Sequence, residues 1–513
     1  MDIWCKSSAF RVMTNTRKGR TDAALLHLHG ARGGRVSGQI LLRSLADFTV
    51  KAVTVDTVPG FPESSVTLYR QGFQYFNDGV PYPDKLLPID TFAVKAHVTQ
   101  GFWVVLDIPA ESAAGRYDFT VKVQTETETL RANVSLRVYD VLMPAPADGA
   151  LDHEYWYQMS ATELCGGTWK AGSDEWWHFA ESLADALKML RVNTLCVSVY
   201  SVMEGRSRRT GKDSWQFDFT LFDAFITRMF DRGSFRRIAI SAPLASLTGD
   251  RVQAFDEVGK VIWLDTRSSE GEAYLTCWLQ ALHAHLTEKG WLDKTILHIE
   301  DEPHESDNWL WMRALVRRYM PSTPCGEPID EYDSALALQD ECDEFIPRLE
   351  VFEQGRDFFA RRQAAGSKVW CYSCCYPEEP WYLNRFIDQP AMYARMLYWA
   401  CFAQDITGFL HWGFNYWGGS LYGLQPEARF KGDGYVVYPV AGGVTPSNRL
   451  LSAAEGAEEY ELFCMAAKHN KEAAKALALT ITRSFSDFCD DPAALDAARI
   501  RLLALCETQV RDF

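Results

Sequence analysis

The sequence lacks the features that define several classes of protein. None of its 513 residues belong to an apolar run approaching the ~18 that a membrane-spanning helix needs. The first residues contain no apolar segment of the kind found in secretory signal peptides, so we expect a cytoplasmic protein. Positive charge is also scarce, because 52 Lys and Arg against 68 Asp and Glu leave a net charge of −16. This balance argues against binding to nucleic acid or to an anionic membrane.

The motifs of several other chemistries are missing as well. Thirteen cysteines are an odd number in a long chain, which indicates free thiols rather than a disulfide framework. Cys371 and Cys374 have metal-binding spacing, but no second pair of ligands completes a zinc site, so we predict neither a metal nor a cofactor. No glycine-rich dinucleotide motif or nucleophile elbow is found. Aromatic residues are plentiful, with 17 Trp, and this suits a protein that stacks on sugar rings.

Residues 1–148 are predicted to form a β-sandwich. Short β-rich segments, several with alternating apolar and polar residues, are separated by turns rich in Gly, Pro and Asp, with no convincing helix between them. These segments lie at 38–42, 48–55, 65–69, 93–98, 102–108, 117–123 and 132–139. The Pro- and Ala-rich stretch at 144–147 is the expected domain boundary.

Residues 149–466 are predicted to form a (β/α)8 TIM-like barrel. Amphipathic helical stretches alternate with strands expected near 152–158, 194–200, 237–242, 295–300, 325–329, 344–349, 368–374 and 407–414. Eight such repeats in about 300 residues fit a barrel; a doubly wound sheet is the alternative, but it has no natural use for eight evenly spaced strands. Residues 467–513 are expected to form a C-terminal helical extension.

Three carboxylates end the strand expected at 295–300. The sequence there is His298-Ile299-Glu300-Asp301-Glu302-Pro303. Like charges this close repel, which raises the pKa of at least one carboxyl, as a general acid requires at neutral pH. Asp301 and Glu302 can serve one pocket only where the strand turns, because successive side chains of a strand point to opposite faces. A solvated acidic loop or the start of the next helix would explain these acids equally well.

Aromatic residues gather at the ends of the last two expected strands. The eighth strand runs into His411-Trp412-Gly413-Phe414-Asn415-Tyr416-Trp417, which suits a sugar-stacking wall in which Asn415 adds directional hydrogen bonds. On the seventh strand, Tyr372 alternates with Trp370 and could point into the same mouth. Packing in the core is the alternative for each of these aromatic residues.

Several of these motifs, in this order, resemble the catalytic domain of glycoside hydrolase family 123. The resemblance covers roughly residues 295–465 and rests on Asp301-Glu302-Pro303, Trp370-Cys371-Tyr372, Asn384-Arg385-Phe386-Ile387-Asp388, residues 408–417, Gly432-Asp433-Gly434-Tyr435 and Pro446-Ser447-Asn448-Arg449. A β-sandwich before the barrel is also the arrangement of that family.

The resemblance implies hydrolysis of terminal β-linked N-acetylgalactosamine, in an oligosaccharide or glycoconjugate, by substrate-assisted retention through an oxazoline-type intermediate. It implies that Glu302 is the general acid and then the base, and that Asp301 orients the 2-acetamido group. Substrate-binding residues would be Tyr372, Trp412, Asn415 and Trp417. Two alternatives stay open: a glycosidase for sugars without a 2-acetamido group, in which Asp301 or Glu300 takes the second carboxylate's role, and a carbohydrate-binding barrel without activity.

Overall fold

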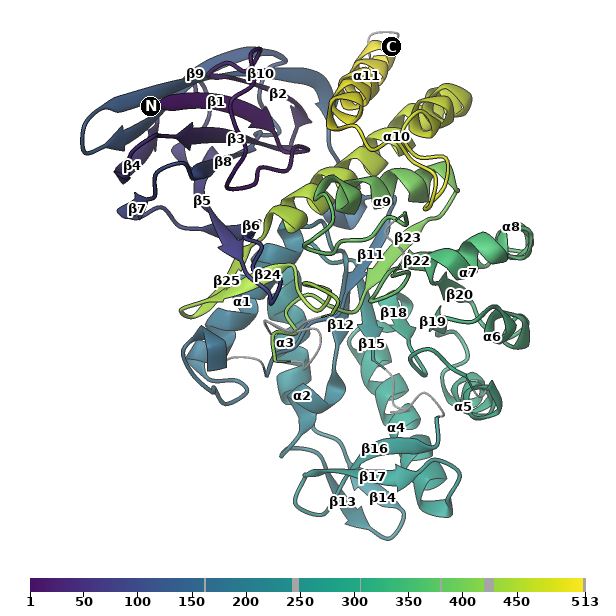
Figure 1. The fold of residues 1–513 in the computed structure, drawn as a ribbon. Coiled ribbons are helices and arrows are strands. Elements are labelled where there is room, and N and C mark those ends of the chain that lie inside the picture. The colour runs from purple at the N-terminus through teal and green to yellow at the C-terminus, as the bar shows by residue number, and fades with distance from the viewer. Residues whose placement is uncertain (161–162, 242–248, 305, 379–380, 419–428, 511–513) are drawn as a thin grey trace.

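The computed structural model describes residues 1–160, 163–241, 249–304, 306–378, 381–418 and 429–510. A sheet-rich N-terminal region is followed by an α/β region and by two long C-terminal helices (Figure 1). All thirteen cysteines lie among the described residues, and all are free thiols. Across the same residues, no helix has an apolar stretch long enough to cross a membrane.

The N-terminal region consists of two five-stranded sheets that enclose a core, as the sandwich prediction expected. One sheet has the order β1 (Asp2–Ser7), β3 (Arg35–Arg43), β8 (Thr99–Asp107), β5 (Val66–Gln74), β6 (Tyr82–Leu87). The other has the order β2 (Leu25–Arg32), β10 (Thr129–Leu142), β9 (Gly115–Thr125), β4 (Phe48–Val55), β7 (Phe92–Val94). Alternate side chains of facing strands, such as Val104 of β8 and Val121 of β9, fill the space between the sheets.

Parallel strands occupy all eight positions predicted for the α/β region. They are β11 (Asp152–Tyr155), β12 (Thr194–Val197), β15 (Arg237–Ile240), β18 (Thr295–Leu297), β19 (Gly326–Ile329), β20 (Glu344–Pro347), the short pair β21 (Lys368–Val369) and β22 (Cys371–Tyr372), and β23 (Gly408–His411). One sheet has the order β18-β15-β12-β11-β23-β22 and another has the order β19-β20-β21. Isolated parallel bridges, Leu297 to Cys325 and Arg348 to Tyr372, connect the two.

Helices follow these strands and bury their apolar faces against them. They are α1 (Asp174–Met189), α2 (Val199–Met203), α3 (Thr220–Arg232), α4 (Ser269–Glu288), α5 (Ser306–Tyr319), α6 (Tyr332–Ala337), α7 (Leu349–Gln354), α8 (Arg356–Ala364) and α9 (Met392–Ala403). Helix α1 begins after Ser173, because the Ser173 hydroxyl accepts the backbone N–H of Trp176 and two acids occupy the first turn. Phe179, Leu183 and Leu187 then line one buried face.

Three hairpins interrupt this alternation. They are β13 (Arg208–Gly211) with β14 (Ser214–Gln216), β16 (Arg251–Phe255) with β17 (Val261–Asp265), and β24 (Val437–Val440) with β25 (Gly443–Pro446). The first two lie at the end of the α/β region that is farthest from the sandwich in Figure 1.

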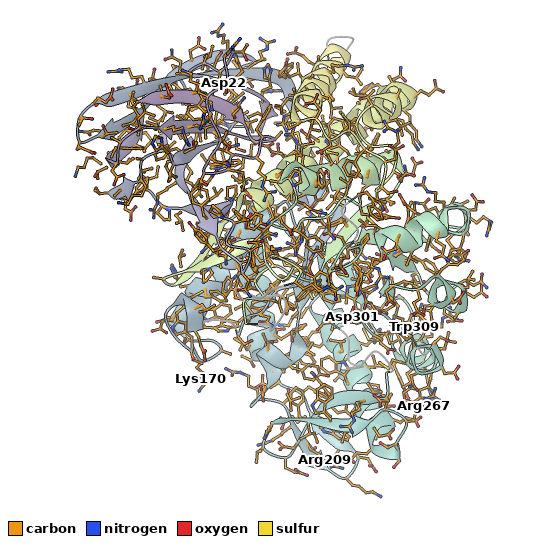
Figure 2. The ribbon with its side chains drawn as sticks, viewed as in Figure 1. Asp22, Lys170, Arg209, Arg267, Asp301 and Trp309 are labelled. Carbon is orange, nitrogen blue, oxygen red and sulfur yellow. The ribbon has the colours of Figure 1, made fainter. Side chains whose placement is uncertain are left out.

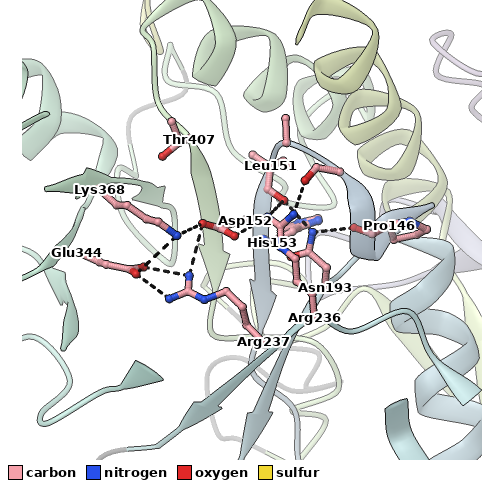
Figure 3. A network of polar contacts seen from close by, with 12 residues as sticks. Pro146, Leu151, Asp152, His153, Asn193, Arg236, Arg237, Glu344, Lys368 and Thr407 are labelled. Carbon is pink, nitrogen blue, oxygen red and sulfur yellow. Dashed lines mark hydrogen bonds and ion pairs between the residues drawn. The ribbon is translucent and has the colours of Figure 1, made fainter. Parts of the chain in front are cut away.

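A network of charges joins the first residues of four strands (Figure 3). Arg237 of β15 donates to Glu344 of β20 at 2.6 Å, and Lys368 of β21 donates to Asp152 of β11 at 2.8 Å. Burial would raise the pKa of Asp152, but the positive charges of Arg237 and Lys368 lower it below its ordinary value. Because these strands lie far apart along the chain, the network fixes their starting points relative to one another.

The C-terminal helices α10 (Asn448–Leu479) and α11 (Pro492–Val510) connect the two regions. The first part of α10 is buried, and its Arg449 forms a two-pronged ion pair with Asp84 of β6, both contacts at 2.9 Å. Glu455 of α10 accepts hydrogen bonds from the hydroxyls of Ser8 and Ser37. Helix α10 crosses residue 466, the expected end of the barrel, without a break, and its non-helical residue is Asn470.

Candidate active site

The acidic segment after β18 turns sharply at Glu302. The backbone of Glu302 has φ of 51°, a left-handed conformation that residues other than Gly seldom adopt. The strand end before it is held by Glu327 of β19, whose carboxylate accepts the backbone N–H of Ile299 at 2.6 Å and of Glu300 at 3.3 Å. The turn therefore lets Asp301 and Glu302 depart from the opposite-face rule of a regular strand.

A cavity of about 560 Å³ opens beside this turn. Its walls come from the segments that follow β11, β12, β15, β18 and β23, and its lining includes Trp156, Tyr157, Gln158, Tyr200, Ser241, His298, Asp301 and Tyr416. Figure 2 labels Asp301 near the centre of the α/β region. The volume lies in the range of small-molecule sites, and the mix of aromatic rings with hydroxyl and carboxyl groups is typical of them.

The two acids have different surroundings. Asp301 lines the cavity, whereas Glu302 is half-buried beside it and accepts a hydrogen bond from the Tyr372 phenol. Burial, followed by the charge of Glu302, raises the pKa of Asp301 to about 7. Burial also raises the pKa of Glu302, but the Tyr372 hydrogen bond works against that rise. The larger upward shift is thus on Asp301 and not on Glu302, which the resemblance makes the general acid.

Glu300, the third acid of the segment, faces elsewhere. It is fully buried and does not line the cavity. Its carboxylate lies against Gly249, just before the β16–β17 hairpin, so closely that a Cβ at that position would be 2.8 Å from it. The structure therefore does not bring Glu300 to the cavity with Asp301.

Tyr372 and Trp412, two of the predicted substrate-binding residues, do not line the cavity either. Both pack in one cluster with Trp156, which lines the cavity. The indole of Trp412 donates to the buried carboxylate of Asp433 at 2.8 Å, which fixes the orientation of its ring. Burial raises the pKa of Tyr372 well above its ordinary value, so its phenol stays protonated and remains a donor to Glu302.

Asn415 and Trp417 do not line the cavity, contrary to the wall that the sequence predicts. The Asn415 amide is fully buried, accepting the backbone N–H of Gln158 at 2.8 Å and donating to its carbonyl at 2.9 Å. Trp417 is 2% exposed and donates to the carbonyl of Val437. The side-chain oxygen and nitrogen of Asn415 thus both bond to the main chain of Gln158, and they hold in place the segment that follows β11.

Of the aromatic residues that line the cavity, Tyr416 belongs to the stretch predicted to form the sugar-stacking wall, whereas Trp156 and Tyr157 were not predicted. Trp156 and Tyr157 follow directly after β11, and Tyr416 stands between the two residues that the sequence singles out. Residues just after a barrel strand form the mouth of such a fold, so position alone could have identified them.

One group of described residues has a spacing that could hold a metal ion. Glu302, His304 and Asp330 each place one ligand atom within 4.8 Å of the others. His304 and Asp330 are already paired at 3.2 Å, and Glu302 is bonded to Tyr372, so internal contacts account for the cluster. Cys371 and Cys374, with their metal-like spacing, are buried thiols.

Comparisons with known proteins identify the family. The model of the glycoside hydrolase 123 catalytic domain matches residues 174–466, more than half of the chain. The chain belongs to glycoside hydrolase family 123. It is therefore a glycoside hydrolase, and the match includes the acidic turn, Tyr372 and Trp412. No curated protein matches the sequence.

Solved structures support the same architecture. A family 123 glycoside hydrolase from Clostridium perfringens, described in a study of glycolipid glycan hydrolysis, covers 100% of this chain and 99% of its own, with a TM-score of 0.78 at 15% identity. At that identity the likeness shows the fold. A β-D-glucuronidase of Dictyoglomus thermophilum (9% identity, covering 83% of this chain and 90% of its own) has a TM-score of 0.34, too low to carry an argument. The same holds for β-glucuronidase 3 of Bacteroides uniformis (11% identity, 84% and 51% covered), with a TM-score of 0.30.

Proposed function

We propose that this family 123 enzyme is a retaining exo-glycosidase that removes terminal β-linked N-acetylgalactosamine by substrate-assisted catalysis. The observation that supports the proposal is that one of two adjacent acids lines the cavity and the other, beside it, has different surroundings. Asp301 faces the space that would hold the sugar, and Glu302 lies beside it, bonded to a phenol. Neither acid needs to form a bond to the sugar in such a mechanism.

In the first step, the acetamido oxygen of the sugar attacks the anomeric carbon while the bond to the leaving oxygen breaks. Glu302 donates its proton to that oxygen. Asp301 accepts a hydrogen bond from the acetamido N–H and stabilises the positive charge that develops on the oxazoline-type ring. In the second step, the Glu302 carboxylate takes a proton from water, which attacks the anomeric carbon and reopens the ring with overall retention.

The mechanism requires the proton on Glu302 when substrate is bound. Asp301 and Glu302 interact, so they lose their protons in two steps as the pH rises. At pH values between these two steps the two carboxyls share one proton. In the empty site the upward pKa shift favours that proton on Asp301. An acetamido N–H donated to Asp301 stabilises its ionised form and moves the proton to Glu302, where the leaving oxygen needs it.

We also infer that the α/β region closes into a (β/α)8 barrel. Parallel pairing passes from β11 through β12 and β15 to β18, and from β19 through β20 to β21. The Leu297–Cys325 and Arg348–Tyr372 bridges join these sets, and β23 pairs with both β22 and β11. The cavity then lies at the carboxyl ends of the strands, where barrel enzymes have their active sites.

The substrate class follows from the same site. A cavity of this size has room for a terminal sugar, and the rest of an oligosaccharide or glycoconjugate would extend outward. The glycolipid glycans named for the Clostridium perfringens enzyme are one such substrate. A cytoplasmic location remains a prediction from the sequence.

The proposal is tested with aryl β-glycosides of N-acetylgalactosamine and of galactose. Wild-type enzyme should hydrolyse only the former. Glu302→Gln should lose about 10²–10⁴-fold in kcat/KM on a poor leaving group and much less on dinitrophenol, which needs no proton. Asp301→Asn should lose activity with every leaving group. Asp307→Asn, an exposed acid on α5, is the matched control. Equal turnover of the galactoside, or undiminished activity of Glu302→Gln on the poor leaving group, would contradict the assignment.

A further inference from the structure

The His298 imidazole lies at the cavity with both of its nitrogens facing acceptors. Nδ1 is 2.6 Å from the carbonyl oxygen of Gly326, and Nε2 is 3.1 Å from Oε1 of Glu154. A carbonyl oxygen can only accept, so Nδ1 carries a hydrogen. Oε1 of Glu154 already accepts the indole N–H of Trp156 at 2.9 Å, as a carboxylate oxygen does. With a Glu154 carboxylate as the second acceptor, both ring nitrogens of His298 are donors and the ring is an imidazolium.

This cation is enclosed and held in one orientation. His298 is 2% exposed, Glu154 is fully buried, and the ring of Trp156 packs edge-on against the imidazole with centroids 6.0 Å apart. Burial alone would lower the pKa of His298, but the charge of Glu154 and its hydrogen bond to the ring outweigh burial and raise the pKa to about 9. Glu327 acts in the same direction with a smaller effect, and burial raises the pKa of Glu327 itself to about 8. The positive charge is thus present throughout the neutral range.

The charged groups around His298 come from three directions. Glu154 faces it from β11 and Glu327 from β19, while Asp301 follows it in the chain and shares the cavity wall. Asp301 in turn faces the negative charges of Glu302 and Asp330, which oppose its ionisation, whereas His298 favours it. Among the groups that shift the pKa of Asp301, His298 is the one that lowers it.

We propose that His298 is a positioning residue whose fixed positive charge, held by Glu154, keeps Asp301 able to ionise at the cavity wall. This inference rests on the function proposed above, because it is the Asp301 carboxylate that meets the substrate's acetamido group. His298 itself acts through Asp301 and has no free ring nitrogen to offer to a ligand. His298, held by Glu154, places a positive charge near Asp301, Glu302 and Asp330, whose negative charges repel one another.

The first test uses the enzyme without substrate, so its outcome is independent of whether any glycoside is cleaved. Carbon NMR of the aspartate carboxyls, assigned with Asp301→Asn, gives the pKa of Asp301 in wild type and in His298→Gln. Loss of a nearby positive charge should raise that pKa by about 1 unit or more. An unchanged or lowered pKa overturns the proposal.

A second buried histidine provides the matched control. His153 of β11 is fully buried and bonded to the Tyr398 phenol at 2.9 Å, and burial lowers its pKa to about 3, so it is neutral. His153→Gln removes a buried imidazole ring from the α/β region without removing a charge. The pKa of Asp301 should not move in this variant, and an equal rise in both variants would show a general effect of packing and overturn the proposal.

Two further measurements keep the proposal falsifiable. If His298→Gln does not fold, nitrogen NMR of the wild-type ring at pH 7 should show two protonated nitrogens; a neutral ring contradicts the proposal. If the variant folds and wild type cleaves an N-acetylgalactosaminide, kcat/KM of the variant should fall about tenfold for each unit that the pKa of Asp301 rises. The alkaline limb of the variant's kcat/KM profile should move to higher pH, following the pKa of Asp301. A fall in kcat/KM with unmoved limbs assigns His298 a structural role only.

Discussion

Tyr372→Phe removes one hydrogen bond from Glu302 and leaves the ring in place. The Tyr372 phenol donates to the Glu302 carboxylate and so stabilises its ionised form. A hydrogen bond to a charged group contributes about 1.5–3 kcal/mol, and a pKa unit corresponds to 1.36 kcal/mol, which gives a shift of about 1–2 units. Because Glu302 is only half-buried, water replaces part of the lost bond, and we expect a rise of about 1 unit.

The assay is the pH dependence of kcat/KM with an aryl N-acetylgalactosaminide. Of the two acids Glu302 has the smaller upward pKa shift, so it loses its proton at the lower pH and sets the acid limb of the profile. In Tyr372→Phe this acid limb should move to a pH about 1 unit higher. Tyr416→Phe is the control, because Tyr416 lines the same cavity without bonding Glu302, and its acid limb should stay in place. An acid limb of Tyr372→Phe that is unmoved or lowered would refute the role given to this bond.

Further predictions concern pH, stability and binding. The wild-type kcat/KM profile should be bell-shaped with an alkaline midpoint near pH 7, because above that pH the pair loses its second proton; a plateau to pH 9 would contradict this. In urea unfolding, Arg237→Met should lower the free energy of unfolding by about 3–5 kcal/mol, because buried Glu344 loses its hydrogen-bonded partner and keeps only Lys368 at 3.7 Å. Arg228→Ala, which removes an exposed ion pair with Glu181, should lower it by less than about 1 kcal/mol. Asn415→Ala should lower the free energy of unfolding by about 1–3 kcal/mol. It should also raise KM more than it lowers kcat, because Asn415 holds the cavity residue Gln158, and an unchanged KM would contradict this.

The order of strands and helices could be predicted from the sequence because local patterns carry it. Short apolar runs predict the positions of the parallel strands, and the Ser173 cap predicts the start of α1. Strand β6 could not be found in this way, since Pro83 argues against a strand. The structure places β6 at the edge of its sheet, where a missing N–H is tolerated, and Asp84 pairs there with Arg449 of α10. That pairing joins residues 365 positions apart, which no local pattern indicates.

The candidate site was predictable in part for a similar reason. Asp301 and Glu302 stand out because three acids end an apolar strand, and the turn they require is the left-handed backbone of Glu302. The role of Asn415 was not predictable, because its use depends on Gln158, which is brought near only by the fold. The role of His298 was likewise not predictable from the sequence, because its partners, Glu154 and the Gly326 carbonyl, are brought to it only by the fold.

The central claim is that the substrate's own acetamido oxygen is the nucleophile. It is tested most directly with a series of aryl β-galactosaminides whose N-acetyl group carries zero, one, two or three fluorine atoms. Each fluorine withdraws electrons from the amide oxygen, so the account predicts that kcat/KM falls steeply and steadily along the series. A rate that does not depend on the number of fluorine atoms would show that the acetamido group is not the nucleophile, and the mechanism given for Asp301 and Glu302 would be wrong.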